Sequence, residues 1–230
     1  MIRRIFYAAV LCLSLPMLSY AAPDSQSNLD ITRINLDMER QSAELVSSLL
    51  EKDQVKSDHL YKLISSNLKK LQKIHAHADF NERRAREMIM VDSWMRLISL
   101  DLKHGAWIGA AIAANQMRGE IIRFTSFSNR TVRDLAWMEY LSRDVMLLSM
   151  ENPTDNLDLI GFRKEALSQV WQHVRVDMIK DFRNKPLVER GDQLMLKMGN
   201  ASNALLLLEF TKGELALVDE LKKVSPVIKQ

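Results

Sequence analysis

The segment MIMVDSWMRLISLDL, residues 88–102, carries the pattern that decides the fold. Its apolar residues follow one another at steps of three and four: Met88, Val91, Met95, Ile98 and Leu102. Such steps place side chains on one face of an α-helix, whereas a half-buried strand alternates at steps of two. The segment therefore predicts an amphipathic helix over residues 81–103, with one face packed against other helices.

The same helical period recurs along most of the chain. Four further apolar stripes are Ile34, Met38, Leu45 and Leu49; Leu60, Ile64, Leu68 and Leu71; Val132, Leu135, Met138, Val145 and Leu148; and Leu167, Val170, Trp171, Val174, Met178 and Phe182. Sustained strand alternation and Asn-Gly or Asp-Gly hairpin turns are missing from the sequence. We expect helices near 29–52, 56–77, 81–103, 106–125, 130–150, 157–183, 187–198, 202–210 and 212–224. Joined by short loops, they predict an all-α antiparallel bundle of about seven to nine helices.

Helix starts and one strong turn refine this layout. Three segments resemble capping boxes, in which side chains satisfy free backbone N–H groups of the first turn: Asp79-Phe-Asn-Glu82, Thr131-Val-Arg-Asp134 and Thr211-Lys-Gly-Glu214. The run Asn152-Pro-Thr-Asp-Asn156 is the strongest turn signal. We expect a single helical domain over residues 22–230, with a possible hinge near 151–156.

The first 21 residues have the order of parts found in a secretory signal peptide. Arg3 and Arg4 supply positive charge, Ile5–Leu18 is apolar, and Ser19 and Ala21 are the small residues of a cleavage site after Ala21. An uncleaved anchor is the alternative, although the apolar run is short for a membrane span. The sequence predicts a cleaved signal peptide over 1–21 and a periplasmic mature protein.

Cleavage would change the bulk properties of the chain. The whole sequence has 32 Lys and Arg against 29 Asp and Glu, and two of the arginines leave with the signal peptide. The mature chain would then be almost neutral, which gives no sign of nucleic-acid binding. Cys12, the only cysteine, would leave too, so we expect a cysteine-free protein without a stable membrane span.

His75-Ala-His77-Ala-Asp79 is the best candidate for a metal site. His75 and Asp79 are four residues apart and would share one face of a helix, whereas His77 would join them only in a non-helical loop. The alternative is a solvated helix end. The chain lacks the Cys-x-x-Cys-His motif of covalent haem attachment, and no residue pattern singles out a non-covalent haem bound by His and Met, so no cofactor is indicated.

Small residues in the segment 105–114 suggest a place for an apolar ligand. On a helix, Gly105, Gly109 and Ala113 would form a smooth strip that another helix or a ligand can approach closely. Candidate lining residues of a pocket there are Trp94, Trp107, Gly109, Ala113 and Trp137. The alternative is a central helix packed tightly by its neighbours.

Two charged positions have simpler interpretations. The basic run 83–86 is flanked by Glu82 and Glu87, which predicts an ion-paired helix face. Glu139 lies among apolar residues, so we expect partial burial with a raised pKa, but no second catalytic group accompanies it.

Reaction motifs are missing from the sequence: we find no Gly-x-Ser-x-Gly, no phosphate-binding loop and no His-Glu-x-x-His. We therefore expect a non-catalytic periplasmic protein that acts through protein–protein contacts, for example as an accessory of an envelope complex. A small-molecule or metal-binding bundle is the first alternative, and an all-helical enzyme is the second.

Overall fold

The computed structural model describes residues 25–76, 81–180, 184–201 and 203–224; of residues 25–28 it describes the backbone alone. Within these ranges the chain forms eight α-helices and no strand. The helices are α1 (Ser25–Leu50), α2 (Gln54–Ala76), α3 (Glu82–Lys103), α4 (Trp107–Phe124), α5 (Arg130–Glu151), α6 (Leu157–Lys180), α7 (Lys185–Asn200) and α8 (Ala204–Val224). The prediction of an all-α bundle of about seven to nine helices is confirmed. The signal peptide predicted over 1–21 lies outside the described residues.

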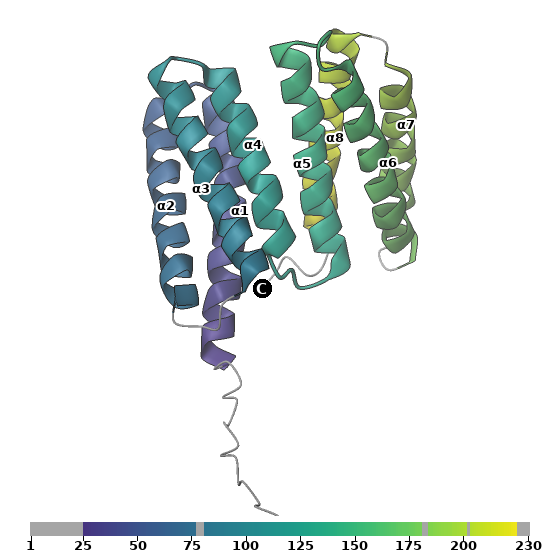
Figure 1. Cartoon of the computed structure of the whole chain (residues 1–230). Coiled ribbons are helices and arrows are strands. Elements are labelled where there is room, and N and C mark those ends of the chain that lie inside the picture. The colour runs from purple at the N-terminus through teal and green to yellow at the C-terminus, as the bar shows by residue number, and fades with distance from the viewer. Residues whose placement is uncertain (1–24, 77–80, 181–183, 202, 225–230) are drawn as a thin grey trace, which may run out of the picture.

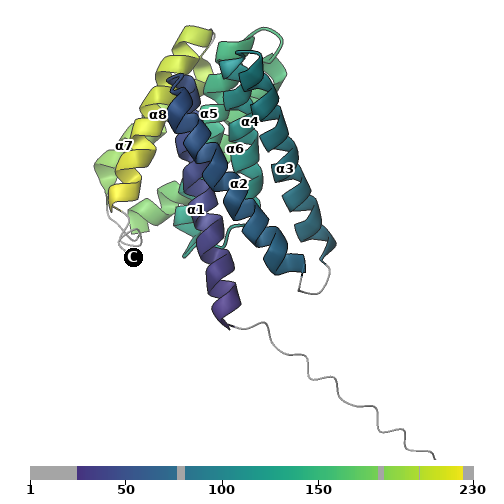
Figure 2. The ribbon, with the colours of Figure 1, turned by 90° about the vertical axis from the view of Figure 1, so that its left-hand side faces the viewer.

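The helices run alternately up and down and form two four-helix bundles side by side (Figure 1). Helices α1–α4 make the first bundle and α5–α8 the second. In the view turned by 90°, α1 and α2 lie in front, with α8 to one side and α3 to the other (Figure 2). The loops after α1, α3, α5 and α7 therefore meet at one end of the molecule, which we call the loop end.

Each bundle has its own apolar core, built from the stripes that the sequence predicts. Met38, Leu45, Ile64 and Ile98 are fully buried in the first core, and Trp171 is fully buried in the second. Burial of such side chains supplies most of the stabilising free energy of a helical bundle.

Helices α4 and α5 join the two bundles by packing against each other along their lengths. Leu147 of α5 belongs to the first core, and Ile122 of α4 belongs to the second. A Cβ atom on Gly119 would lie 2.9 Å from the ring of Tyr140, so this glycine lets the two backbones approach closely. We call this contact the seam between the bundles.

The predicted break between residues 210 and 212 is wrong, because α8 continues from Ala204 to Val224. Thr211 is buried inside this helix, and its hydroxyl donates to the carbonyl oxygen of Leu207 at 2.8 Å. Glu214 is buried as well and accepts a hydrogen bond from Ser142. Both residues of the predicted capping box thus make contacts inside the bundle.

The other two predicted capping boxes are also displaced. The N-cap of α5 is Asn129, whose side chain accepts from the backbone N–H of Val132, and Thr131 lies within the helix. The N-cap of α3 is Asn81, whereas Asp79 lies outside the described residues. Asparagine is among the best N-cap residues. A side chain therefore caps the first turn of each helix as predicted, but from a residue two positions away.

Asn152 and Asp155 lie in the loop between α5 and α6, where the Asn152 side-chain amide donates to the Asp155 carboxylate at 2.6 Å. The backbone N–H of Asn156 also donates to the carbonyl oxygen of Asn152 at 3.1 Å. These bonds make a compact turn within the second bundle. The hinge predicted near 151–156 and the single domain over 22–230 stay predictions.

Candidate functional site

A pocket of about 210 Å³ opens at the end of the first bundle opposite the loop end. It lies where the start of α1, the end of α2, the start of α3 and the end of α4 come together. Within the first bundle, α2 and α3 contact each other less than the other neighbouring helices do, and this leaves the space open. The lining residues are Ile31, Thr32, Asn35, Leu71, His75, Arg84, Glu87, Met88, Phe124 and Ser126.

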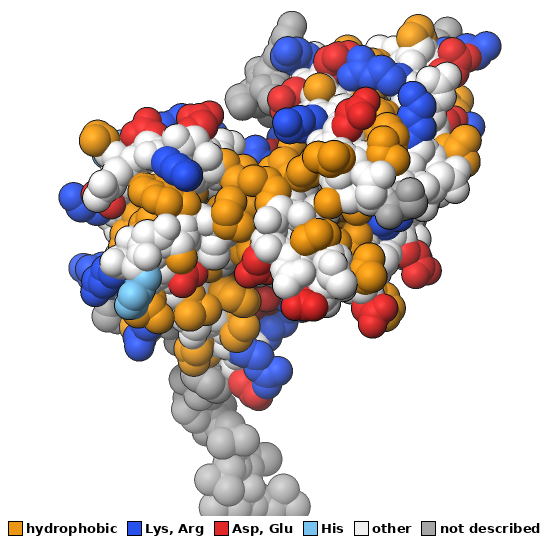
Figure 3. Space-filling view, turned by 90° about the horizontal axis from the view of Figure 1, so that it is seen from above, with side chains coloured by type: hydrophobic (Ala, Val, Ile, Leu, Met, Phe, Trp, Pro, Cys, Tyr) orange, Lys and Arg blue, Asp and Glu red, His pale blue; other side chains and the backbone are white. Residues whose placement is uncertain are grey.

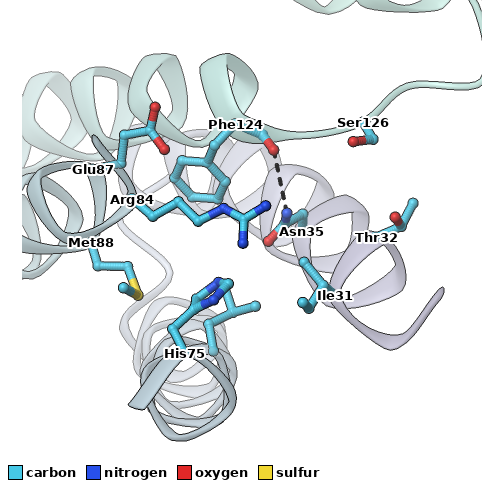
Figure 4. A pocket seen from close by; sticks show the side chains of 10 residues that line it. Ile31, Thr32, Asn35, His75, Arg84, Glu87, Met88, Phe124 and Ser126 are labelled. Carbon is cyan, nitrogen blue, oxygen red and sulfur yellow. Dashed lines mark hydrogen bonds between the residues drawn. The ribbon is translucent and has the colours of Figure 1, made fainter. Parts of the chain in front are cut away.

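Asn35 supplies an unusual polar group to this pocket. Its side chain is only 5% exposed, and its amide nitrogen donates to the carbonyl oxygen of Phe124 at 3.4 Å. Its amide oxygen is buried and has no hydrogen-bond partner among the described residues. In Figure 4 this oxygen faces the side of the pocket where Arg84 lies. A buried acceptor without a partner costs free energy, so a hydrogen-bond donor that entered the pocket would remove this cost.

Arg84 brings a positive charge into the same pocket. Its backbone N–H donates to the Asn81 side chain at 3.0 Å, which fixes the residue in the first turn of α3. The guanidinium extends between His75 and Asn35, as Figure 4 shows. Among the described residues it has no ion-pair partner within 4 Å.

The neighbouring arginines behave as the sequence predicts. Arg83 pairs with Glu87 at 3.0 Å, and Arg86 pairs with Glu82 at 3.0 Å. The ion-paired helix face is thus confirmed for these two residues. Arg84 is the member of the run that turns toward the pocket instead.

His75 forms the wall on the side of α2. Partial burial lowers the pKa of its imidazole, and the nearby positive charge of Arg84 lowers this pKa further. The ring is therefore neutral at neutral pH, with one nitrogen able to donate a hydrogen bond and the other able to accept one.

The predicted metal site at His75, His77 and Asp79 is described only in part, because His77 and Asp79 lie outside the described residues. Within the described ranges, no three His, Cys, Asp or Glu side chains gather as they would around a metal ion. The metal site stays a prediction.

The pocket combines these polar groups with apolar walls. Ile31, Leu71, Met88 and Phe124 surround the space, and Thr32 and Ser126 bring hydroxyl groups to its rim. A second hollow of about 220 Å³ shares His75, Arg84 and Met88 with the pocket. An apolar space with a few converging polar groups is the usual form of a small-molecule site.

The residues predicted to line an apolar ligand pocket lie elsewhere. Trp94 and Trp107 pack against the first core, whereas Trp137 packs against the second and meets the ring of Tyr140 edge to face. Gly109 and Ala113 lie on α4, where a Cβ on Gly109 would come 2.9 Å from the carboxylate of Asp101. Close contact with α3 thus explains this glycine, and ligand binding by these five residues stays a prediction.

Gly105 does not extend the predicted strip, because it lies in the turn before α4. Its φ angle is +70°, in the left-handed region that glycine adopts without strain. The small-residue strip on the helix therefore begins at Gly109.

The seam contains a buried ionic group, the seam cluster, made of Glu39, Arg118, Glu139, Arg143 and Lys222. These residues come from α1, α4, α5 and α8, so the cluster joins both bundles. A shallow hollow of about 190 Å³ lies against it, between the first bundle and α8.

The expected raised pKa of Glu139 is wrong. Burial alone would raise it, but the charges of Arg118, Lys222 and Arg143 hold the pKa of this carboxyl well below its usual range. The sequence places Arg143 one helical turn away, yet Arg118 and Lys222 come from other helices. Glu139 is thus ionised at neutral pH and acts as a structural anion.

A second buried polar group lies along the seam around Asp144. Its carboxylate accepts hydrogen bonds from Gln116 at 2.8 Å and from Arg163 at 2.6 Å. The hydroxyl of Tyr140 donates to Gln116 at 3.1 Å, and burial raises the pKa of Tyr140 to about 12. These bonds connect α4, α5 and α6 and supply a polar complement to the apolar packing.

The loop end carries several exposed apolar side chains. Figure 3 looks onto this end and shows apolar side chains gathered over its middle, with charged side chains around the edge. Phe162 on α6 is 68% exposed and Leu205 on α8 is 79% exposed. Other exposed members near the ends of helices there are Val55, Leu100, Met150, Leu157 and Leu159. These seven residues lie on the first two turns or the last turn of five helices, and together we call them the apolar end face.

No helix in the described ranges is both long enough and apolar enough to cross a membrane. Protein-family profiles, curated proteins and solved structures were compared with this chain, and none matches.

Sequence reasoning missed both Asn35 and the seam cluster as features of interest. Asn35 does leave a signal, since it lies next to Ile34 and between Ile31 and Met38 on the apolar face of the first helix. A polar side chain at such a position is buried with or without a partner. The role of Arg84 depends on tertiary packing and has no comparable signal.

Proposed function

We propose that the protein is exported to the periplasm and acts there without catalysis, by holding a protein partner of the cell envelope on its apolar end face. An accessory subunit of an envelope complex is the role that fits best. The residues 1–21 support export, because they combine positive charge, an apolar run and a small-residue cleavage site.

The observation that carries this proposal is the exposure of large apolar side chains at one end of the molecule. Phe162 and Leu157 lie on the first two turns of α6, and Leu205 lies at the start of α8. Single exposed apolar residues are common on protein surfaces, but a group with a charged surround is typical of a contact surface. Exposed aromatic side chains such as Phe162 often provide the anchor of such a surface.

Photocrosslinking in cells tests the proposal. A photoreactive amino acid in place of Phe162 is expected to capture one envelope protein reproducibly. The same substitution at Leu29, which is exposed near the start of α1 at the opposite end, serves as the matched control.

A double variant then separates specific capture of a partner from incidental crosslinking. A Leu157→Glu and Leu205→Glu double variant places charges on the apolar end face and is expected to abolish capture at position 162. Equal capture at positions 29 and 162, or capture that survives the double variant, would count against this function.

A further inference from the structure

The pocket at the end of the first bundle contains one polar group that only accepts hydrogen bonds and another that only donates them. The buried amide oxygen of Asn35 can only accept a hydrogen bond, and it has no donor among the described residues. The guanidinium of Arg84 can only donate, and no described carboxylate pairs with it. A ligand that satisfies both groups must carry a donor and an anionic acceptor.

The positions of Asn35 and Arg84 determine how far apart the donor and the anionic acceptor of the ligand must lie. Asn35 belongs to α1 and Arg84 to α3, and their polar atoms face the same space in Figure 4. A donor and an acceptor that serve them must therefore lie close together on one small molecule. An α-amino acid has this form, since its ammonium and carboxylate groups are attached to the same carbon.

The other residues that line the pocket determine which ligand side chain fits there. Leu71, Met88 and Ile31 offer apolar contacts beyond the polar groups. The volume of about 210 Å³ is below the roughly 300–1,000 Å³ of drug-sized sites, which favours a molecule as small as an amino acid.

We propose that this pocket binds a free α-amino acid with an apolar side chain. The ligand carboxylate pairs with Arg84, the ammonium donates to Asn35, and the apolar side chain packs against Leu71 and Met88. The imidazole of His75, which lies beside Arg84, adds a hydrogen bond at the carboxylate. Charge-assisted bonds of this kind are among the strongest in proteins, and the carboxylate of an amino acid suits the planar guanidinium.

Other small ligands fit this set of groups less well. A metal cation would be repelled by Arg84, which extends into the middle of the pocket, and unlike an amino acid it brings no carboxylate to pair with the guanidinium. A phosphate would pair with the guanidinium of Arg84, but it carries no ammonium group to donate to the acceptor oxygen of Asn35.

Calorimetric titration of the purified protein with L-leucine, L-methionine and L-phenylalanine tests the proposal. Saturable binding of at least one of them below about 10 mM is expected. 4-Methylpentanoate, which is leucine without its ammonium group, and leucinamide, which lacks the carboxylate, are each expected to bind at least about tenfold more weakly. The absence of saturable binding by all three amino acids would overturn the proposal.

Variants then place the ligand in the pocket. Arg84→Gln changes an exposed side chain and is expected to weaken binding about tenfold or more. Arg86→Gln is the matched control two positions away, outside the pocket, and is expected to leave binding unchanged. Asn35→Leu is expected to abolish binding of the amino acid.

A local spectroscopic measurement closes the test. The imidazole resonances of His75 are expected to shift on addition of the amino acid in the unaltered protein and in Arg86→Gln. Binding that is undiminished in Arg84→Gln, or that leaves the His75 resonances unchanged, would show that the ligand lies elsewhere and would overturn the proposal.

Discussion

The guanidinium of Arg118 on α4 donates a hydrogen bond of 2.8 Å to the carboxylate of Glu139 on α5, at the seam between the two bundles. The same guanidinium donates to Glu39 on α1 at 2.6 Å and 3.0 Å. Arg118 is only 1% exposed, so one buried cation connects three helices. Without Arg118, Glu39 has no ion-pair partner among the described residues, and the buried Glu139 keeps only Arg143 and Lys222.

We expect Arg118→Met to lower the free energy of unfolding by about 3–5 kcal/mol, because Glu39 and Glu139 lose their common partner. Chemical denaturation at neutral pH measures this change. Arg123→Met is the matched control on the same helix, where an exposed pair with Glu120 contributes below about 1 kcal/mol. Equal effects of the two substitutions would contradict the role assigned to the seam cluster.

The lowered pKa of Glu139 predicts that the protein loses stability in acid. Its pKa in the folded protein lies well below the ordinary value of 4.5, chiefly because Arg118, Lys222 and Arg143 outweigh the effect of burial. The folded state therefore binds fewer protons than the unfolded state as the pH falls below about 4.5. Stability supplied by Glu139 is present above this pH and is lost progressively below it. In Glu139→Gln the acid limb of the stability curve is expected to be shallower, as measured by denaturation between pH 2 and 6.

Glu214 predicts the opposite dependence. Burial raises its pKa to about 7, although a hydrogen bond of 3.0 Å from Ser142 lowers this pKa in part. Between about 4.5 and 7 the folded state keeps a proton that the unfolded state has lost. Stability therefore falls as the pH rises through this window, by roughly 3 kcal/mol in total.

Glu214→Gln removes this titration and keeps an acceptor for Ser142. The variant is expected to be more stable than the unaltered protein at pH 8, by about 2–3 kcal/mol, and similar to it at pH 4. Glu209→Gln, at an exposed position of the same helix, controls for the change of one surface charge. A difference that does not grow between pH 4 and pH 8 would refute the assignment.

Two glycines provide a contrast in packing. A Cβ atom on Gly191 of α7 would lie 2.2 Å from the ring of the fully buried Trp171, whereas one on Gly161 of α6 would meet nothing within 4 Å. Gly191→Ala is expected to destabilise the protein by about 1–3 kcal/mol through overpacking. Gly161→Ala is expected to stabilise it by about 0.5–1 kcal/mol, because alanine is the better helix former. Thermal unfolding measures both, and a stable Gly191→Ala variant would contradict the observed α6–α7 packing.

Much of the fold follows from the apolar period of the sequence. The segment 88–102 predicts α3 because its apolar residues step at three and four, and Val91, Met95 and Ile98 are indeed buried. The sequence pattern did not predict that α8 is continuous, because Thr211 and Glu214 have the spacing of a capping box and so resemble the start of a new helix. Their burial depends on α5, which approaches from far along the chain.

The pocket and the seam cluster were harder to predict for the same reason. Asn35 and Arg84 are 49 positions apart in the numbering, and Arg118 and Lys222 are farther apart still. Local patterns specify the helices, but they do not specify which helix ends diverge or which buried charges meet. The pairing of α1 with α4 and of α5 with α8 determines both.

The position of Lys222 bears on how the chain is made. This residue lies two positions before the end of α8, yet its ammonium group pairs with Glu139 on the first helix of the second bundle. Helices α1–α4 precede α8 in the chain, so the first bundle can assemble while its neighbour is still incomplete. Until the last helix arrives, the face of α5 that α8 covers stays open, and Leu141 and Val145 are available to chaperones or to aggregation. The second bundle is therefore complete only after α8 has docked on α5, and truncations that remove α8 are expected to unfold and to be degraded rather than to be partly active.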